Sequence, residues 1–423
     1  LYLMQHALYT PSPSLLEGEL AAIPSKSDAH RILILAALSN GTTRVEINRL
    51  SDDIQTTIDC LLALGAEILR TPDALVVRGS SVFTEHPELN CRESGSTLRF
   101  LLPVAAVRGA NARFIGSGRL PERPIGELME AMRQHGVRFS AEQLPFSMEG
   151  RLSGGTYALP GNVSSQYLTG LLLALPLAGQ DSRIALTTKL ESAAYVEMTL
   201  RSLRAFGAVI DEQNGTYHII GSQVYRSPGQ ISVEGDWSNA AFFLAAGALG
   251  GRIRLTGLSA ESSQGDKAIV TALEAFGAGV LQSGGAVEVS ARPLHGCELD
   301  VSETPDLLPI LAVLAANAEG ETRLVNAARL RYKESDRLTA TANLVNALGG
   351  SAKELPDGLI VSGGGLCGGT VDGCRDHRIV MSAAIASIAC SEPVTILGAD
   401  AVNKSYPEFF EDFAHWGGNW HVV

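Results

Sequence analysis

The sequence contains no apolar run of the roughly 18 residues that a membrane-spanning helix needs. The best candidate, residues 171–178, is short and is interrupted by Pro176. Residues 1–10 lack the basic start and long apolar run of a secretion signal. Only six cysteines occur, and they are scattered along the chain. These features predict a cytoplasmic protein with free thiols and no membrane association.

The usual motifs of cofactor chemistry are also missing. No His and Cys spacing fits a metal site. No glycine-rich phosphate loop ends in Gly-Lys-Ser or Gly-Lys-Thr, and no dinucleotide fingerprint follows a strand. No arrangement of Ser, His and Asp or of Cys and His marks a covalent nucleophile. We therefore expect neither a metal nor a bound cofactor.

Charge is scarce as well. Of 423 residues, 18% are charged and 45% are hydrophobic, and the net charge is −12, from 33 Lys and Arg against 45 Asp and Glu. An acidic chain is a poor ligand for nucleic acid, so we expect no nucleic-acid partner. In such a chain a local cluster of Lys and Arg is informative.

What is present is a sixfold repeat. A helical pattern ends six times in the same way, with glycine where a left-handed residue closes a helix. These glycines are Gly65, Gly136, Gly207, Gly277, Gly349 and Gly417. Their residue numbers differ by 71, 71, 70, 72 and 68. The regular spacing predicts six copies of one structural unit.

A second series of helices has the same period. Its starts lie near Ser or Asp residues, which cap helices well: Ser27, Ser94, Ser164, Asp236, Asp306 and Asp376. Each repeat then reads as helix, strand, helix and strand, with one or two further strands. The sequence therefore predicts an α/β protein.

Six repeats exceed one core, so we expect two similar domains of three repeats each. The predicted boundaries give one domain of residues 23–229. The other domain combines residues 1–22 with 230–423. We expect the active site in the cleft between the domains.

The candidate functional residues gather at helix starts, where free amide hydrogens and the helix dipole attract anions. The basic residues at these positions are Lys26, Arg31, Arg123, Lys333, Arg337, Arg378 and Lys404. Gly95 lies in a run of small residues that lets a ligand approach the backbone. Asp236 and Asp266 also lie at helix starts, and we interpret them as structural caps. The pattern predicts small, phosphorylated and carboxylated substrates.

Together these motifs resemble the EPSP synthase (3-phosphoshikimate 1-carboxyvinyltransferase) family over nearly the whole chain. They are 25–27 (Ser-Lys-Ser), 122–125 (Glu-Arg-Pro-Ile), 164–166 (Ser-Ser-Gln), 333–337 (Lys-Glu-Ser-Asp-Arg), 376–378 (Asp-His-Arg) and Lys404. The resemblance implies an inside-out α/β barrel fold in two domains that close over the substrates. It implies transfer of enolpyruvyl from phosphoenolpyruvate to the 5-hydroxyl of shikimate 3-phosphate, with release of phosphate, by a monomer.

The resemblance also implies roles for individual residues. Shikimate 3-phosphate would contact Lys26, Ser27, Arg31, Ser164, Ser165, Gln166, Ser192, Tyr195, Asp306 and Lys333. Phosphoenolpyruvate would contact Lys26, Gly95, Arg123, Gln166, Arg337, Arg378 and Lys404. We hypothesise that Asp306 takes the hydroxyl proton, and that Glu334, with Lys26 or Lys404, handles the proton at the methylene.

Two alternatives remain at this point. One is the sister transferase that acts on UDP-N-acetylglucosamine, which uses a cysteine-bearing loop, whereas residues 116–124 contain no cysteine. The other is a noncatalytic binding protein built from repeats. The sequence departs from the family at Glu93, an acidic residue beside the small-residue run near Gly95, and there we expect the side chain to point away. No substrate contact is assigned to Arg329.

Overall fold

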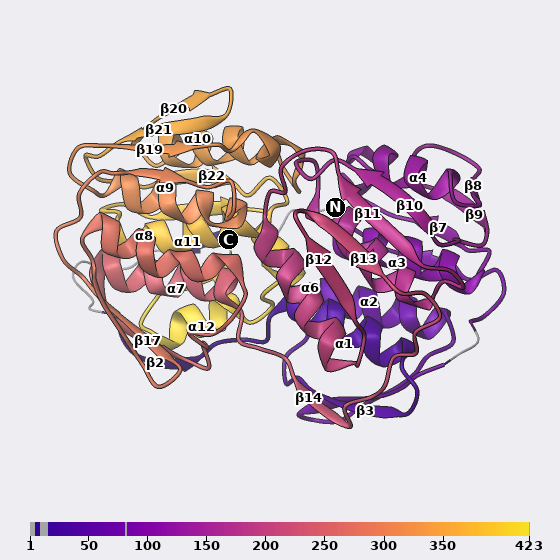
Figure 1. Cartoon of the computed structure of the whole chain (residues 1–423). Coiled ribbons are helices and arrows are strands. Elements are labelled where there is room, and N and C mark those ends of the chain that lie inside the picture. Colours follow the sequence, from indigo (N-terminus) through magenta and orange to yellow (C-terminus); the bar gives the residue numbers. More distant parts are fainter. Residues whose placement is uncertain (1–4, 9–15, 81–82, 423) are drawn as a thin grey trace. The chain divides into compact units, whose positions relative to one another are not determined.

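The computed structural model describes residues 5–8, 16–80 and 83–422, which form two compact units (Figure 1). The central unit is continuous and runs from Lys26 to Val233. The terminal unit combines the described residues up to Ser25 with those from Glu234 onward. Each unit has its own hydrophobic core. No helix in the described ranges is long and apolar enough to cross a membrane.

The central unit contains three four-stranded sheets, each with one parallel pair followed by two antiparallel pairs. Their strands, in sheet order, are β14 (Gln230–Ser232), β3 (Thr42–Glu46), β5 (Ala74–Arg78) and β4 (Glu67–Arg70); β6 (Glu88–Asn90), β7 (Arg113–Ile115), β9 (Phe146–Gly150) and β8 (Val137–Phe139); β10 (Gly155–Leu159), β11 (Ser182–Leu186), β13 (Thr216–Ile219) and β12 (Ile210–Gln213). Its helices are α1 (Lys26–Leu38), α2 (Asp52–Ala63), α3 (Gly95–Arg108), α4 (Gly126–Arg133), α5 (Ser165–Ala174) and α6 (Ala193–Ala205), with 3₁₀ turns η1 (Leu120–Glu122) and η2 (Leu175–Leu177).

The terminal unit repeats this plan. Its sheets are β2 (Leu16–Ala21), β15 (Gly251–Thr256), β17 (Ala286–Ser290) and β16 (Gly279–Ser283); β18 (Glu298–Asp300), β19 (Glu321–Val325), β21 (Gly358–Ser362) and β20 (Ser351–Leu355); β22 (Gly369–Asp372), β23 (Val394–Leu397), β1 (Gln5–Leu8) and β24 (Trp420–Val422). Its helices are α7 (Trp237–Gly250), α8 (Ile269–Phe276), α9 (Leu308–Ala316), α10 (Arg337–Ala347), α11 (His377–Ala386) and α12 (Phe409–His415). Its 3₁₀ turns are η3 (Gly265–Ala268), η4 (Pro305–Leu307), η5 (Ala328–Tyr332), η6 (Ser387–Ala389) and η7 (Ala399–Lys404).

The first helix of each repeat is buried on nearly all sides. In the terminal unit α7, α9 and α11 pack against one another, and every residue of α9 is buried. Such helices are apolar around their whole circumference, which is typical of a helix inside a core. The predicted inside-out α/β arrangement, with helices inside and sheets outside, is therefore confirmed.

The helix ends follow the predicted repeat. All six repeat glycines have positive φ, between 79° at Gly207 and 99° at Gly65. Four of the six predicted starts are N-caps whose side chains accept from backbone amides: Ser94, Ser164, Asp236 and Asp376. The other two differ. Ser27 is the second residue of α1, and Asp306 lies in η4, where its carboxylate is used elsewhere.

The strand just before each crossing between the units pairs with a repeat of the unit that the chain is leaving. Strand β2 precedes α1 in sequence but pairs with β15 of the fourth repeat. Strand β14 precedes α7 but pairs with β3 of the first repeat. As a result each unit has a complete set of three sheets, and residues 230–233 belong to the central unit.

Candidate functional site

The central unit carries ten of the predicted site residues, and the terminal unit carries six. The first set is Lys26, Ser27, Arg31, Gly95, Arg123, Ser164, Ser165, Gln166, Ser192 and Tyr195. The second set is Asp306, Lys333, Glu334, Arg337, Arg378 and Lys404.

Lys26 is the first residue of α1, and its position is fixed by an acidic residue of α2. Its Nζ donates to Asp53 Oδ2 at 2.9 Å. The two side chains are only 14% and 9% exposed. Partly buried charges need partners, so Asp53 directs the ammonium group. Asp53 is not among the residues predicted from the sequence.

Arg31 connects α1 to the start of α6. Its Nε donates to Thr199 Oγ1 at 2.8 Å, and its Nη2 donates to the Tyr195 carbonyl at 2.9 Å. Its Nη1 donates to the Ser27 carbonyl. Burial lowers the pKa of this guanidinium to about 10, which still leaves it charged at neutral pH. Arg31 thus hydrogen-bonds to two of the predicted site residues, Ser27 and Tyr195. Ser192, just before α6, has a left-handed backbone conformation with φ 54°.

Residues from α3 and α5 join in a second group. Gln166 Oε1 accepts from Arg99 Nη1 at 3.1 Å, and Gln166 Nε2 donates to Ser96 Oγ at 3.0 Å. Arg99 Nη2 also donates to the Pro124 carbonyl at 2.7 Å. A methyl group on Gly95 would lie 2.9 Å from Arg123 Nη1. Arg99 is therefore part of this group, although it was not predicted as a site residue.

The segment around Arg123 joins η1 to α4. Arg123 follows η1, and α4 begins at Gly126 with Ile125 as its N-cap. Pro124 therefore lies before the helix. Its carbonyl accepts from Arg99, which ties this segment to α3.

A chain of buried hydrogen bonds lies beneath the starts of α1, α2 and α3. His30 Nδ1 and Thr57 Oγ1 are 2.7 Å apart, and Thr57 Oγ1 lies 2.7 Å from Thr97 Oγ1. Thr97 Oγ1 donates to the capping Ser94 Oγ at 2.8 Å. Burial lowers the pKa of His30 to about 3, so the ring is neutral. This chain connects α1, α2 and α3.

In the terminal unit Asp306 is surrounded by three cations. Its Oδ1 accepts from Arg337 Nη1 at 2.6 Å and lies 3.9 Å from Lys333 Nζ. Its Oδ2 accepts from Arg378 Nη2 at 3.3 Å. Burial raises the pKa of this carboxyl, but the charges of Arg378, Lys333 and Arg337 outweigh it and hold the pKa well below the usual range. Asp306 is therefore ionised.

Arg337 is the most heavily paired of these cations. It is 1% exposed, and it donates to Asp376 Oδ2 at 2.8 Å and to Glu334 Oε2 at 2.8 Å. Burial opposes the charge, but these carboxylates raise the pKa of Arg337 well above its usual value. Lys333 follows η5, and α10 begins only at Arg337, so the two residues do not share one face of a helix. Asp306 instead lies between them.

Arg378 completes the cluster around Asp306, and Lys404 is a further buried cation of the same unit. Arg378 is 2% exposed, and its Nη1 donates to the Ser238 carbonyl at 2.9 Å. Lys404 closes η7 and is 8% exposed. Within the described ranges, no group of three or more His, Cys, Asp or Glu residues could hold a metal ion.

The fourth repeat contributes a residue that we had interpreted as a cap. Asp266 is 1% exposed, and its Oδ2 accepts from Ser238 Oγ. Burial, followed by the nearby charge of Asp306, raises the pKa of Asp266 to about 7. The sequence showed an Asp at a helix start, which is the same signal that a simple cap gives. Asp236, in contrast, is a cap as predicted.

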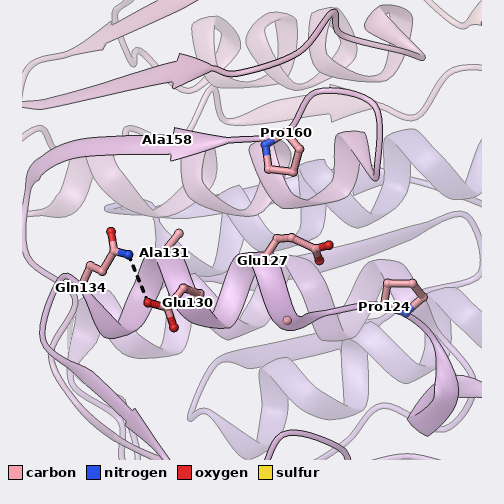
Figure 2. Close-up of a pocket in the computed structure, with 8 residues that line it drawn as sticks. Pro124, Glu127, Glu130, Ala131, Gln134, Ala158 and Pro160 are labelled. Carbon is pink, nitrogen blue, oxygen red and sulfur yellow. Dashed lines mark hydrogen bonds between the residues drawn. The ribbon is translucent and has the colours of Figure 1, made fainter.

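A pocket of about 630 Å³ lies beside α4 in the central unit, and Figure 2 shows its lining. The residues that line it include Glu127, Glu130 and Gln134. Gln134 Nε2 donates to Glu130 Oε1 at 3.1 Å. Its lining contains no Lys or Arg. An acidic pocket of this kind does not suit anionic ligands, so the basic clusters are the better candidate site.

Glu93, the departure from the expected motif, lies close to Gly118. A methyl group on Gly118 would overlap its carboxylate, and Gly118 has φ 57°. The side chain therefore packs against the loop that follows β7.

Comparison with known families matches residues 11–413 to the family described as EPSP synthase (3-phosphoshikimate 1-carboxyvinyltransferase). The 3-phosphoshikimate 1-carboxyvinyltransferase of Clostridium perfringens is 42% identical over 414 residues, covering 96% of this chain and 97% of the relative. That of Clostridium kluyveri is 42% identical over 412 residues, covering 96% of each chain.

Solved structures with a similar fold include a member of the same family. An EPSP synthase from Acinetobacter baumannii has a TM-score of 0.84 and 26% identity, covering 99% of this chain and 100% of that one. The enolpyruvyl transferase NikO from Streptomyces tendae has a TM-score of 0.80 at 19% identity, covering 100% of this chain and 99% of that one. The second likeness concerns the fold alone.

Proposed function

This chain belongs to the EPSP synthase (3-phosphoshikimate 1-carboxyvinyltransferase) family, and on that premise we propose that its two basic clusters bind the two substrates of one reaction. It is an enzyme of the shikimate pathway. It transfers the enolpyruvyl group of phosphoenolpyruvate to the 5-hydroxyl of shikimate 3-phosphate and releases phosphate. The UDP-N-acetylglucosamine and noncatalytic alternatives are not favoured by relatives that carry this name over nearly their whole length.

We assign shikimate 3-phosphate mainly to the central unit. Its phosphate would be held by Ser164, Ser165 and Ser192, whose hydroxyls lie at the starts of α5 and α6. Tyr195 and Gln166 lie in the first turns of the same helices. Helix starts bind phosphate through free amides and the helix dipole, so these positions suit the ligand. Lys333 and Asp306 of the terminal unit would contact the same molecule.

Phosphoenolpyruvate requires cations with directed hydrogen bonds. We assign it to Arg123 beside Gly95, to Arg337 and Arg378 around Asp306, and to Lys26 and Lys404. Guanidinium groups bind carboxylate and phosphate in a bidentate way, which fixes both charge and orientation.

The reaction is an addition followed by an elimination. The 5-oxygen bonds to C2 of phosphoenolpyruvate while its proton leaves, and a proton bonds to the C3 methylene. Phosphate then leaves C2 and a proton leaves C3, which restores the double bond. A base and an acid must therefore flank the reacting atoms.

We propose Asp306 as the base and Glu334 as the group that exchanges the C3 proton, with Lys26 or Lys404. Asp306 is ionised, so it can accept a proton, but three adjacent cations make it a weak base. When Arg337 and Arg378 turn to phosphoenolpyruvate, this stabilisation of the carboxylate decreases and its basicity rises. Substrate binding would thus activate the base.

The observation that carries the proposal is Asp306 itself. One partly buried carboxylate lies within 4 Å of three cations, and these cations belong to motifs of the matched family. A carboxylate in that setting pairs with the cations that bind the substrate anion when no substrate is bound.

The test measures phosphate release and the enolpyruvyl product with shikimate 3-phosphate and phosphoenolpyruvate, and in parallel with UDP-N-acetylglucosamine as acceptor. Loss of one catalytic proton transfer costs roughly 10²–10⁴-fold, so Asp306→Asn should lose kcat on that scale while shikimate 3-phosphate still binds by calorimetry. Turnover with the nucleotide sugar alone would refute the function. Near-normal turnover of Asp306→Asn would refute only the assignment of the base.

We further propose a cytoplasmic monomer that does not bind nucleic acid. The six cysteines are free thiols, and the net charge is −12. Sedimentation of the purified protein, with and without DNA, tests the mass and the nucleic-acid part of this proposal.

A further inference from the structure

Asp266 lies at the end of a chain of contacts that leads to the proposed base. Its Oδ2 accepts from the hydroxyl of Ser238 in the first turn of α7. The carbonyl of the same Ser238 accepts from Arg378 Nη1 at 2.9 Å. Arg378 Nη2 donates to Asp306 Oδ2 at 3.3 Å. Ser238 therefore connects Asp266 to the guanidinium group that we assign to phosphoenolpyruvate.

The surroundings of Asp266 provide few groups that would stabilise an ionised carboxylate. The residue is 1% exposed, and among the described residues its Oδ1 has no hydrogen-bond partner. The nearby cation Arg378 directs its two terminal nitrogens at Ser238 and Asp306. A buried carboxylate without a paired cation is costly when it is charged.

The other charged groups that act on Asp266 are Asp306 in η4 and Asp236, the cap of α7. Both are acidic, so both oppose a further negative charge. Lys267, the next residue, donates instead to the carbonyls of Ala260 and Ser262. Two carboxyl groups that share one cation ionise one at a time. Here Asp306 has the three cations and is the ionised partner.

We propose that Asp266 is a positioning residue for phosphoenolpyruvate binding that works as a neutral acid: it holds Ser238, and through Ser238 the Arg378 guanidinium, without adding a second negative charge beside Asp306. This inference rests on the proposed function, because it requires Arg378 to bind the substrate. Ionisation of Asp266 would attract Arg378 and repel the anionic substrate.

The raised pKa of Asp266, about 7, gives the inference a signature. Below this pH the acid is neutral and Arg378 is available. As pH rises through about 7, Asp266 loses its proton and binding of phosphoenolpyruvate weakens. One such ionisation gives a decline that approaches tenfold per pH unit in kcat/KM for phosphoenolpyruvate, a quantity that reports on the enzyme before this substrate binds.

The experiment measures kcat/KM for phosphoenolpyruvate from pH 6 to 9 at saturating shikimate 3-phosphate, in the wild type and in Asp266→Asn. The amide is a permanent neutral analogue of the acid. We expect Asp266→Asn to lack the decline near pH 7 and to exceed the wild type at pH 8.5. Ionisation of the substrate phosphates affects both proteins alike, so the ratio of the two profiles isolates Asp266. The exposed carboxylate of Glu261 supplies a matched control, and Glu261→Gln should retain the wild-type profile.

A second variant covers the case in which Asp266→Asn does not fold. In Ser238→Ala the acid remains but loses the hydroxyl that stabilises its ionised form. Its pKa should rise, so the decline should move to higher pH. Profiles that coincide with the wild type in every folded variant would overturn the inference while leaving the enzymatic function intact. A wild-type protein that releases no phosphate would refute the function itself.

Discussion

Gly95 at the start of α3 gives the sharpest test of the phosphoenolpyruvate assignment. An alanine methyl group there would lie 2.9 Å from Arg123 Nη1 and 3.0 Å from its Cζ, and it would come closer still to Arg99 Nη1. Ordinary contacts of a methyl group begin near 3.4 Å. Both guanidinium groups must therefore move, although the backbone need not.

The expected effect of Gly95→Ala falls on binding and not on folding. Loss of one charge-assisted hydrogen bond costs about 1.5–3 kcal/mol, which corresponds to a rise of roughly 10- to 100-fold in KM for phosphoenolpyruvate. The KM for shikimate 3-phosphate should rise less, because Ser164, Ser165 and Ser192 are not displaced and only Gln166 is affected, through its hydrogen bond from Arg99. Alanine also favours a helix over glycine by about 0.5–1 kcal/mol, so thermal stability should not fall.

Phosphate release at varied phosphoenolpyruvate and saturating cosubstrate measures this change. Gly126→Ala is the matched control, because Gly126 also opens a helix of the central unit but has no atom within 4 Å of an added methyl group. A KM for phosphoenolpyruvate within twofold of the wild type would refute the assignment of this helix start to that substrate.

Two further predictions concern pH and the repeat. Burial lowers the pKa of Lys333 to about 8, so kcat/KM for shikimate 3-phosphate should fall as pH rises through 8. Lys333→Arg should remove this decline, because an arginine side chain stays charged over this pH range. An identical decline in both proteins would contradict the role of Lys333. Gly207 has φ 79° and no atom near an added methyl group. The strained backbone of Gly207→Ala should therefore lower the free energy of unfolding by about 1–2 kcal/mol and lower the thermal midpoint. Gly179 is equally open but has no positive φ, so Gly179→Ala should keep the wild-type midpoint. Equal midpoints for the two variants would show that the helix ends do not require this conformation.

The sequence predicted those features that depend on local chemistry. The six glycines and four of the capping residues could be recognised because a helix end imposes the same conformation in each repeat. The predicted boundaries placed residues 1–22 with the terminal unit, where β2 pairs, but they also placed β14 there, although it pairs with β3 of the central unit. The pairing of β14 could not be read, because the pairing partner of a strand lies far away in sequence.

The site shows the same limit. The basic residues were recognisable as charges in an acidic chain, but their partners were not. Asp53 and Arg99 contribute through contacts between different helices, and no spacing within one motif reports such contacts. Asp266 was missed because an Asp that caps a helix and an Asp buried as a neutral acid give the same letter at the same position.

The long-range pairing of strands determines the order in which the chain can be completed during synthesis. The central unit is one continuous segment, so it can fold once Val233 has left the ribosome. The terminal unit cannot, because β1 pairs with β23 and β24, with Gln5 opposite Leu397 and His6 opposite Val422. Strand β1 therefore finds its partners only after β23 and β24 have been made, and it waits as an unpaired edge during most of translation, whereas β2 can pair once β15 has been made. A circular permutant that begins at Glu234 and carries the first 25 residues after its old C-terminus would make the terminal unit continuous and remove this wait.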